Sequence, residues 1–333
     1  LSRAIGFYGE TENKKIQSGT SKINSNIINV KSYESITNEK ALDKWLNILN
    51  KQSVIAVDTE TSSLNPLEAD LVGVSFSYAS NKACYIPLAH KNIKGLKKEV
   101  ILKKIKPILE DPSIKKVGQN IKFDFLILSQ NNIEINPIED TMLISYTLDA
   151  GTNRHNLDTL SEIHLNHKTI SYKELVGTGK NKLNFSDIAL DKATEYAAED
   201  ADVTLRLYKY LIARLNEEKL NKIYEDFEKP MVKLLSKLEF NGIKVDDAYL
   251  KNLSKNFEGR LKKIEKKIYS IAGKEFNIAS PKQLGEIIYN ELKITKLKKT
   301  KKGSLATSAN ILEDLALAGH KFPNLVLEWR QIS

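Results

Sequence analysis

The stretch Val54-Ile55-Ala56-Val57-Asp58-Thr59-Glu60 decides how the first part of the chain folds. Its four leading apolar residues are typical of a buried strand, which we expect to end at Asp58. Because side chains alternate along a strand, Asp58 and Glu60 should lie on one side and Thr59 on the other. Two carboxylates this close repel each other unless a cation lies between them, and oxygen ligands favour Mg²⁺ or Mn²⁺. Alone, an Asp-x-Glu pair is also typical of a solvated loop end.

Short apolar segments around this stretch predict a sheet. Residues 71–78 and 83–88 have the pattern of two strands joined by a turn, and 114–118 that of another strand. Apolar residues at helical spacing over 100–109 predict a helix between them. Strands mixed with helices, with an early antiparallel pair, indicate an α/β sheet covered by helices. From residue 140 to about 215 the pattern is helical throughout.

Two further segments add carboxylates to the first pair. Asn120 is a candidate N-cap for a helix over 123–129, which places Asp124 in the first turn of that helix. Tyr196 and Asp200 are four residues apart and therefore share one helix face. Each pattern also has an ordinary explanation. Asp124 can simply favour the N-terminal dipole of its helix, and Asp200 can belong to a solvated surface.

The remainder of the chain has a purely helical pattern. Apolar residues recur at three- and four-residue spacing over 220–241 and 250–273, so we expect two long amphipathic helices in an antiparallel hairpin. We place a polar linker at residues 1–27, an α/β domain at 28–217 and an all-helical region at 218–333.

Composition and charge narrow the class of protein. Hydrophobic residues make up 41% of the chain, which indicates a globular fold. No apolar run approaches the length of a membrane span. The single cysteine, Cys84, excludes an internal disulfide. Of the net charge of +9, residues 251–333 carry all the excess, with 17 basic and 8 acidic residues. A basic end is typical of a surface that binds a polyanion, nucleic acid first, and equally of a solvated lysine-rich helical face. The chain opens at Leu1 without a signal segment, so we expect a cytosolic piece of a longer protein.

Taken together, the motifs resemble a known family. The series Asp58-x-Glu60, Asn120-x-x-Phe123-Asp124 and Tyr196-x-x-x-Asp200 is similar, in order and spacing, to the three motifs of DnaQ-like 3′→5′ exonucleases of the tyrosine type. The stretches DTETSSL (58–64), VGQNIKFD (117–124) and YAAEDADVTLRL (196–207) resemble the proofreading domain of family A DNA polymerases of the bacterial polymerase I type. FNIASPKQLGEIIY (276–289) and the lysine-rich run before LATSANILEDLA (305–316) resemble the thumb of these polymerases.

The resemblance implies a ribonuclease H-like fold with a mixed sheet, and a site that holds two divalent ions, Mg²⁺ or Mn²⁺. By motif position, Asp58 would bridge both ions, Glu60 and Asp200 would complete the site of the ion that activates the nucleophile, and Asp124 would hold the second ion through water. Tyr196 would orient the attacking water with Glu60 as its partner. The implied reaction is hydrolysis of terminal phosphodiesters of DNA with release of 5′-mononucleotides.

The resemblance also implies contacts with substrate. Leu64 and Phe185 match apolar side chains that wedge against the terminal bases of single-stranded or frayed 3′ ends. The thumb-like region would contact the duplex backbone. The remaining expected DNA-binding residues are Asn120, Lys298, Lys299, Lys301, Lys302 and Arg330. We expect a monomer in the bacterial cytosol, without a membrane partner.

Two other functions stay open. The chain could be a silent DNA-binding scaffold, although Asp58, Glu60, Asp124 and Asp200 are all in place. It could instead be a ribonuclease of the RNase D type, whose exonuclease motifs are similar but whose following helices would not resemble a thumb. The resemblance ends before the palm and fingers of a polymerase, so we expect no primer extension by these 333 residues.

Overall fold

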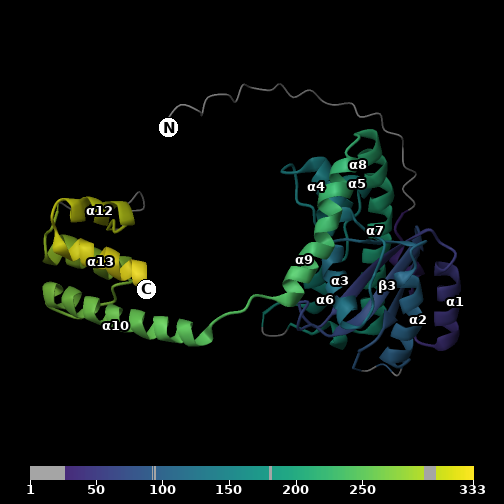
Figure 1. Ribbon diagram of the computed structural model, residues 1–333, viewed down its shortest axis with the longest axis horizontal. Helices are drawn as coiled ribbons and strands as arrows, with labels where there is room; N and C mark the ends of the chain where they lie inside the picture. The colour runs from purple at the N-terminus through teal and green to yellow at the C-terminus, as the bar shows by residue number, and fades with distance from the viewer. Residues whose placement is uncertain (1–26, 92, 94, 180–181, 296–304) are drawn as a thin grey trace. The chain divides into compact units, whose positions relative to one another are not determined.

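The computed structural model of the protein describes residues 27–91, 93, 95–179, 182–295 and 305–333. The chain divides into two compact units, with the division after Gly242. The first unit is a sheet covered by helices, and the second is built from helices (Figure 1). The fold class expected from the sequence, a mixed α/β sheet followed by a helical region, is confirmed.

The first unit is organised around one mixed sheet (Figure 1). Its strand order is β1-β4-β3-β2-β5-β6. Its strands are β1 (Glu34–Ser35), β2 (Val54–Thr61), β3 (Leu71–Ala79), β4 (Lys82–Pro87), β5 (Lys115–Gly118) and β6 (Ile138–Asp140). The pairs β2–β3 and β3–β4 are antiparallel, whereas β1–β4, β2–β5 and β5–β6 are parallel. The strand that carries Asp58 and Glu60, β2, therefore lies inside the sheet, where its backbone is held on both sides.

Helices cover both faces of this sheet. They are α1 (Glu39–Leu49), α2 (Lys98–Glu110), α3 (Ile121–Gln130), α4 (Thr141–Asp149), α5 (Leu157–Leu165), α6 (Tyr172–Val176), α7 (Leu190–Glu217), α8 (Asn221–Ile223) and α9 (Lys229–Asn241). Ile55 and Val57 of β2 share a hydrophobic core with α1, α2 and α3. On the other side, α7 packs against β2, β3 and β4 and also contacts α4 and α5. The alternation along β2 thus directs its two acidic residues toward α7.

The sequence does not predict the short strands β1 and β6. It predicts instead a helical region that begins at residue 140. β6 has three residues and β1 has two, so neither is long enough to show a two-residue alternation. Asp140 nevertheless marks the transition, because its side chain caps α4 by accepting from the backbone N–H of Met142 at 2.9 Å.

The segment after α7 packs onto the first unit. Tyr224, in a π-helical turn at Tyr224–Glu228, is fully buried, and its hydroxyl donates to Glu139 Oε2 and accepts from the Asp140 N–H, both at 3.0 Å. Lys229 pairs with Glu139 at 3.0 Å, and α9 contacts α3. The boundary that the sequence suggests at residues 217–218 therefore coincides with the end of α7, whereas the compact units divide 25 residues later, after Gly242.

The second unit has a core of its own. Its helices are α10 (Asp247–Ala272), α11 (Pro281–Glu286), α12 (Ala309–Leu317) and α13 (Lys321–Ile332), with a π-helical turn at Ile287–Glu291. Ile264 and Ile268 of α10 pack with Leu284, Leu312 and Val326. Among the helices of the described residues, none has the length and apolar character that crossing a membrane requires.

One glycine shows how tightly the sheet packs beside the acidic residues of β2. Gly73 pairs with Glu60 across β2 and β3, and a Cβ at Gly73 would lie 2.0 Å from the Tyr85 hydroxyl oxygen. Gly73→Ala should therefore displace the Tyr85 ring and lower the free energy of unfolding by about 1–3 kcal/mol. Chemical denaturation of the two proteins measures this difference.

Gly259→Ala is the matched control, because Gly259 lies in the exposed interior of α10 with open space around its Cβ position. Alanine should stabilise that helix by roughly 0.5–1 kcal/mol. Equal effects of the two substitutions would contradict the close packing of Gly73 against Tyr85.

Candidate active site

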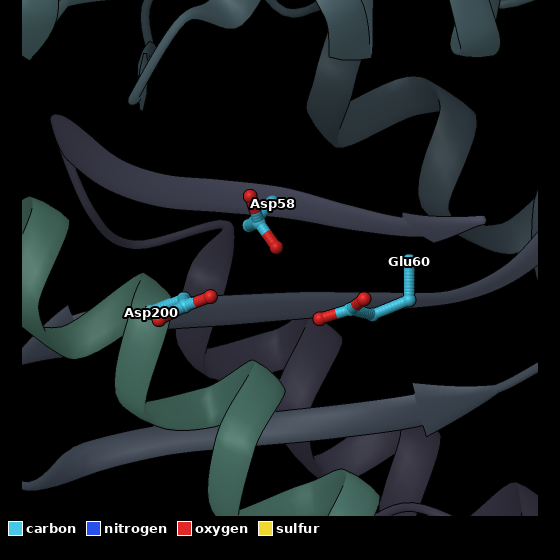
Figure 2. Close-up of side chains that lie close together, drawn as sticks. All are labelled: Asp58, Glu60 and Asp200. Carbon is cyan, nitrogen blue, oxygen red and sulfur yellow. The ribbon is translucent and has the colours of Figure 1, made fainter. Parts of the chain in front are cut away.

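Three carboxylates from distant parts of the sequence meet between β2 and α7. Asp58, Glu60 and Asp200 each offer an oxygen atom, and these oxygens all lie within 4.8 Å of one another (Figure 2). We call these three residues the acidic cluster. A row of alanines on α7 lets this helix lie close to the sheet: Ala193, Ala197, Ala198 and Ala201 are all fully buried. Local alternation places the first two carboxylates together, and the close approach of α7 adds the third.

Burial and mutual repulsion raise the pKa values of the acidic cluster. The pKa of Asp58 lies well above its usual range because of burial and the neighbouring charge of Asp200. Burial followed by repulsion from Asp58 does the same to the pKa of Glu60. The pKa of Asp200 is also raised, first by burial and then by Glu199. Each carboxylate disfavours the ionised form of its neighbours, so a positive charge among them would stabilise all three.

The donor chemistry of the acidic cluster fits a hard divalent cation. All the offered atoms are carboxylate oxygens, which are the ligands that Mg²⁺ and Mn²⁺ prefer. Glu60 is 7% exposed, and its Oε1 is buried without a hydrogen-bond partner. A buried carboxylate oxygen that lacks a partner is costly unless a cation or proton satisfies it. The cluster is thus compatible with a metal site.

Asp124 reaches the same strand but makes different contacts. Its Oδ1 accepts hydrogen bonds from the Thr59 N–H at 2.9 Å and from the Thr59 hydroxyl at 2.6 Å. Burial, then the charge of Asp58, raise the pKa of Asp124, while the bonds from Thr59 oppose that rise. Asp124 is outside the set of oxygens that lie within 4.8 Å. It therefore lies beside the acidic cluster, fixed to β2 through Thr59.

Tyr196 lies one helical turn before Asp200 and contacts the acidic cluster from α7. Its hydroxyl is hydrogen-bonded to Asp200, and this bond partly offsets the rise in the pKa of Asp200. Burial and the nearby charges of Asp200 and Glu60 raise the pKa of Tyr196. The phenol therefore keeps its proton and can act as a hydrogen-bond donor or acceptor beside the carboxylates.

Comparison with known proteins identifies the family. The family model described as 3'-5' exonuclease matches residues 33–216, which contain the acidic cluster, Asp124 and Tyr196. The chain belongs to the 3'-5' exonuclease family. A second model, described as DNA polymerase family A, matches residues 247–333, in the helical unit.

Relatives of this exonuclease family member are similar over nearly the whole chain. DNA polymerase I of Rhizobium leguminosarum is 42% identical over 91% of the chain, and that of Pseudomonas aeruginosa is 38% identical over 90%. The chain spans 32% and 34% of their lengths. The solved POL domain of Pol1 from M. smegmatis, in complex with DNA primer-template and dNTP, has the same fold. Its TM-score is 0.70 at 23% identity, over 90% of this chain and 48% of that one.

The two apolar residues expected to contact bases lie in different environments. Leu64 is 85% exposed and free to contact a ligand. Phe185 is only 1% exposed, because its ring packs among Tyr85, His90 and Tyr196. In this structure Phe185 supports Tyr196 and has no free face for a base, which differs from the expectation.

The sequence interpretation missed an aromatic residue at this site, Tyr172. It is half-buried at the first residue of α6, and its ring centroid lies 5.9 Å from that of Tyr196. The ammonium of Lys182 lies 5.7 Å from the centroid of the Tyr172 ring. The charge of Glu60, after burial, raises the pKa of Tyr172, which places its phenol near the acidic cluster. Its helix is short and has no apolar period, so the sequence gives little sign of this position.

Asn120 is the N-cap residue of α3, as its sequence position suggests, but its side chain does not cap the helix. It takes a left-handed conformation, with φ at 60°, and its side chain makes no capping hydrogen bond. The carboxylate of Asp140 accepts from the backbone N–H groups of Asn120 and Ile121 instead, at 3.1 and 3.0 Å. The predicted N-cap position is thus confirmed, but the polar side chain that binds the start of this helix is that of Asp140, distant in sequence.

The other expected DNA-binding residues belong to the second unit. Arg330 of α13 donates to the carbonyl oxygen of Thr307 at 2.9 Å. The four lysines expected at the thumb tip lie outside the described residues: Lys298, Lys299, Lys301 and Lys302.

Repulsion within the acidic cluster has a measurable consequence for stability. In excess EDTA, Asp58→Asn should raise the free energy of unfolding by about 1–2 kcal/mol, because it removes one charge from a buried group of like charges. Mn²⁺ should stabilise the wild type more than the variant, which has lost one ligand. Thermal and chemical unfolding with EDTA or Mn²⁺ measure both differences.

Asp70→Asn is the matched control, since Asp70 is exposed at the start of β3. Its stability should stay within about 0.5 kcal/mol of the wild type under both conditions. A loss of stability in the Asp58→Asn variant in EDTA would show that repulsion is not the dominant effect at this position.

Proposed function

We propose that the chain carries a metal-dependent 3′→5′ exodeoxyribonuclease that serves as the proofreading module of a polymerase I-like enzyme. It hydrolyses the terminal phosphodiester of DNA and releases 5′-mononucleotides. The observation that carries this proposal is the acidic cluster, three converging carboxylates with Tyr196 hydrogen-bonded beside them. Membership of the 3'-5' exonuclease family supports it.

The acidic cluster and Asp124 are the proposed holders of two divalent ions, Mg²⁺ or Mn²⁺. Asp58 interacts electrostatically with both Asp200 and Asp124, so it is suited to be the ligand that the two ions share. Glu60 and Asp200 complete one site, and Asp124 serves the second through water. When bound, such ions stabilise charge on the phosphate and lower the pKa of water. The unpartnered Oε1 of Glu60 gives this cluster an open ligand position.

The protein's own groups position the reactants. The Tyr196 hydroxyl keeps its proton and is oriented by Asp200. It can therefore hold the attacking water, while Glu60 accepts the proton that this water loses. The bond from Thr59 fixes Asp124, and the ring of Phe185 fixes that of Tyr196. These contacts hold the polar groups in place before substrate binds, which lowers the entropic cost of reaction.

Two partly exposed side chains are the proposed contacts for the terminal nucleotides. Leu64 offers an apolar surface, and Tyr172 offers an aromatic face next to Tyr196. Bases stack on such surfaces without sequence preference. A mispaired 3′ end costs less to unstack than a paired one, so this site would favour frayed ends.

DNA is the proposed partner of both units. The second unit carries the excess of positive charge, and Arg330 and the four tip lysines remain proposed contacts to the duplex backbone. A solved relative with the same fold is a complex with DNA primer-template, which supports this proposal. We propose that residues 28–217 act as the exonuclease domain and 218–333 as a thumb portion, in a monomer of the bacterial cytosol.

The proposed reaction predicts nuclease activity that depends on metal and on the acidic cluster. Single-stranded DNA labelled at the 5′ end should shorten stepwise from its 3′ end with Mg²⁺ or Mn²⁺, faster than paired DNA does. Excess EDTA should abolish the reaction. Asp200→Ala should lower kcat at least ~10³-fold, because it removes a metal ligand. Denaturing gels and chromatography of the released nucleotides measure both rate and product.

The matched control is Asp191→Ala, which removes an exposed carboxylate from the first turn of the same helix, and its activity should equal that of the wild type. An RNA of the same sequence tests the RNase D-type alternative. Faster cleavage of RNA than DNA would favour that alternative, and wild-type activity in the Asp200→Ala variant or in EDTA would rule out the proposed mechanism.

A separate substitution tests the hydroxyl of Tyr196. Tyr196→Phe removes one oxygen and keeps the ring contacts with Tyr172 and Phe185. The maximal rate should fall by roughly 10- to 1,000-fold if the hydroxyl positions the attacking water. The Mn²⁺ concentration for half-maximal activity should change little, since the metal-binding carboxylates are intact. Rates across an Mn²⁺ titration measure both quantities.

Tyr210→Phe provides the comparison, because Tyr210 lies on the same helix with its ring against His164. This variant should keep the wild-type rate. If Tyr196→Phe also kept it, Tyr196 would only fill space beside the acidic cluster.

A further inference from the structure

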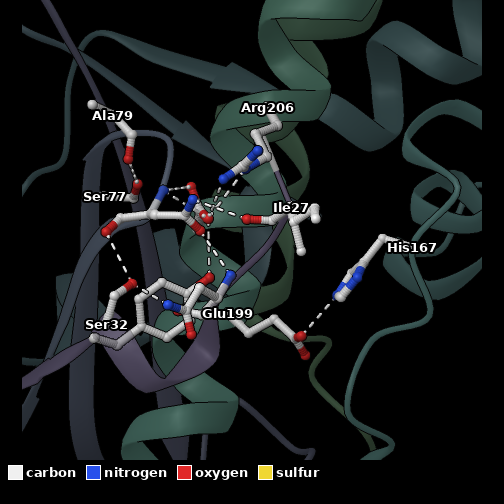
Figure 3. A network of polar contacts seen from close by, with 11 residues as sticks. Ile27, Ser32, Ser77, Ala79, His167, Glu199 and Arg206 are labelled. Atoms are coloured by element: carbon white, nitrogen blue, oxygen red, sulfur yellow. Dashed lines mark hydrogen bonds and ion pairs between the residues drawn. The ribbon is translucent and has the colours of Figure 1, made fainter. Parts of the chain in front are cut away.

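A second buried carboxylate on α7, Glu199, is adjacent to Asp200 in sequence but makes different contacts. Its side chain is 1% exposed. Oε1 lies 2.8 Å from His167 Nε2 (Figure 3). Oε2 accepts the backbone N–H of Ile170 at 2.6 Å. Both partners belong to the segment that connects α5 to α6. Glu199 therefore ties this segment to α7 at two points.

The connecting segment, residues 166–171, is also attached to α5. The Ser161 hydroxyl donates to the carbonyl oxygen of His167 at 2.9 Å. The hydroxyl of Thr169 donates to Asp158 at 2.7 Å. These bonds fix the segment to the helix before it, whereas the bonds to Glu199 fix its distance from the helix that carries Asp200 and Tyr196. The segment then leads directly into Tyr172.

Tyr172 follows Ile170 by two residues, and its ring packs against Tyr196. Without the bonds to Glu199, apolar packing of Tyr172 with Ala193 and Ala197 would still hold this part of the chain to α7. The polar bonds that fix its position would be lost, so Tyr172 could shift relative to Tyr196. Hydrogen bonds to a buried carboxylate are directional, and they fix geometry better than apolar packing does. Glu199 accordingly controls the position of an aromatic face at the site.

We propose that Glu199 is a positioning residue that, through His167 and Ile170, holds Tyr172 in place for the terminal nucleoside of the substrate. This inference rests on the proposed nuclease function for its substrate, but the clamp itself is a property of the fold. Its effect should be on substrate affinity more than on the chemical step. The hydrogen bonds of Glu199 go to the connecting segment, but its charge also raises the pKa of Asp200. Variants of His167 keep that charge, so they separate the clamp from an effect on the acidic cluster.

Variants of both partners test the clamp. Glu199→Leu removes both acceptors, whereas Glu199→Gln keeps a carbonyl oxygen for the Ile170 N–H and an amide for His167. His167→Phe removes one bond, and His167→Gln can restore it. Hydrogen–deuterium exchange of peptides covering residues 167–172 reports the segment directly. Fluorescence anisotropy gives the Kd for single-stranded DNA in EDTA, where cleavage does not occur.

In the Glu199→Leu variant, exchange over residues 167–172 should be at least ~10-fold faster than in the wild type. The Kd and the KM should each rise about 5- to 50-fold. His167→Phe should show the same effects to a smaller extent, with kcat within ~3-fold of the wild type because Glu199 keeps its charge. The two Gln variants should restore most of the affinity, which a purely space-filling role would not require.

Asp202→Asn is the matched control for general destabilisation. Asp202 is also fully buried on α7, but it accepts from Tyr33, Asn81 and Arg206, outside the connecting segment. This variant should unfold more easily yet keep the wild-type exchange over 167–172 and the wild-type Kd.

Unchanged exchange in Glu199→Leu, or an equal rise in Kd in Asp202→Asn, would overturn the clamp. A wild type that binds DNA but does not cleave it would contradict the proposed nuclease, while exchange and Kd would still decide the role of Glu199.

Discussion

Mutual repulsion among buried carboxylates is the constraint on which the first unit depends. Asp58, Glu60 and Asp200 converge within 4.8 Å, and burial and like charge raise the pKa of each. Such an arrangement opposes folding unless rigid surroundings impose it. The two carboxylates of β2 are held by an internal strand paired on both sides, and the third by a 28-residue helix. The packing of the sheet and α7 therefore offsets the unfavourable free energy of the repulsion within the acidic cluster.

The packing around the acidic cluster is correspondingly close. The Tyr85 ring occupies the space that a side chain at Gly73 would need, directly beside the residue that pairs with Glu60. Phe185 packs between Tyr85 and Tyr196, so the aromatic rings form a continuous support for the phenol of Tyr196. Asp124 is held through Thr59, the residue that alternation turns away from the other two carboxylates. Asp124 and Tyr196 each have a neighbour that fixes their orientation, which is what preorganisation requires.

Sequence alone predicts the parts of this site that local geometry controls. Alternation places Asp58 and Glu60 together, and the four-residue spacing places Tyr196 beside Asp200. The meeting of β2 with α7 is a tertiary event, and only the resemblance to a family suggested it. The environments of Phe185 and Tyr172 were not predictable either, because both are aromatic residues outside long periodic segments and only packing decides which one is buried. The sequence places Asn120 correctly at the N-cap of α3, but the contact of Asp140 with the start of this helix comes from another strand and could not be predicted.

The rotation of α7 about its own axis determines which of its side chains face the acidic cluster. Successive residues on a helix point about 100° apart. Glu199 and Asp200 are neighbours in sequence, yet one faces the segment before α6 and the other faces the acidic cluster. A rotation of α7 by one residue would turn Asp200 away from β2 and Glu199 away from His167 and Ile170. The buried contacts of Glu199 and Asp202 therefore select the one rotation that directs Asp200 and Tyr196 toward β2. The helix that supplies the third carboxylate is thus oriented by polar contacts that lie outside the site itself.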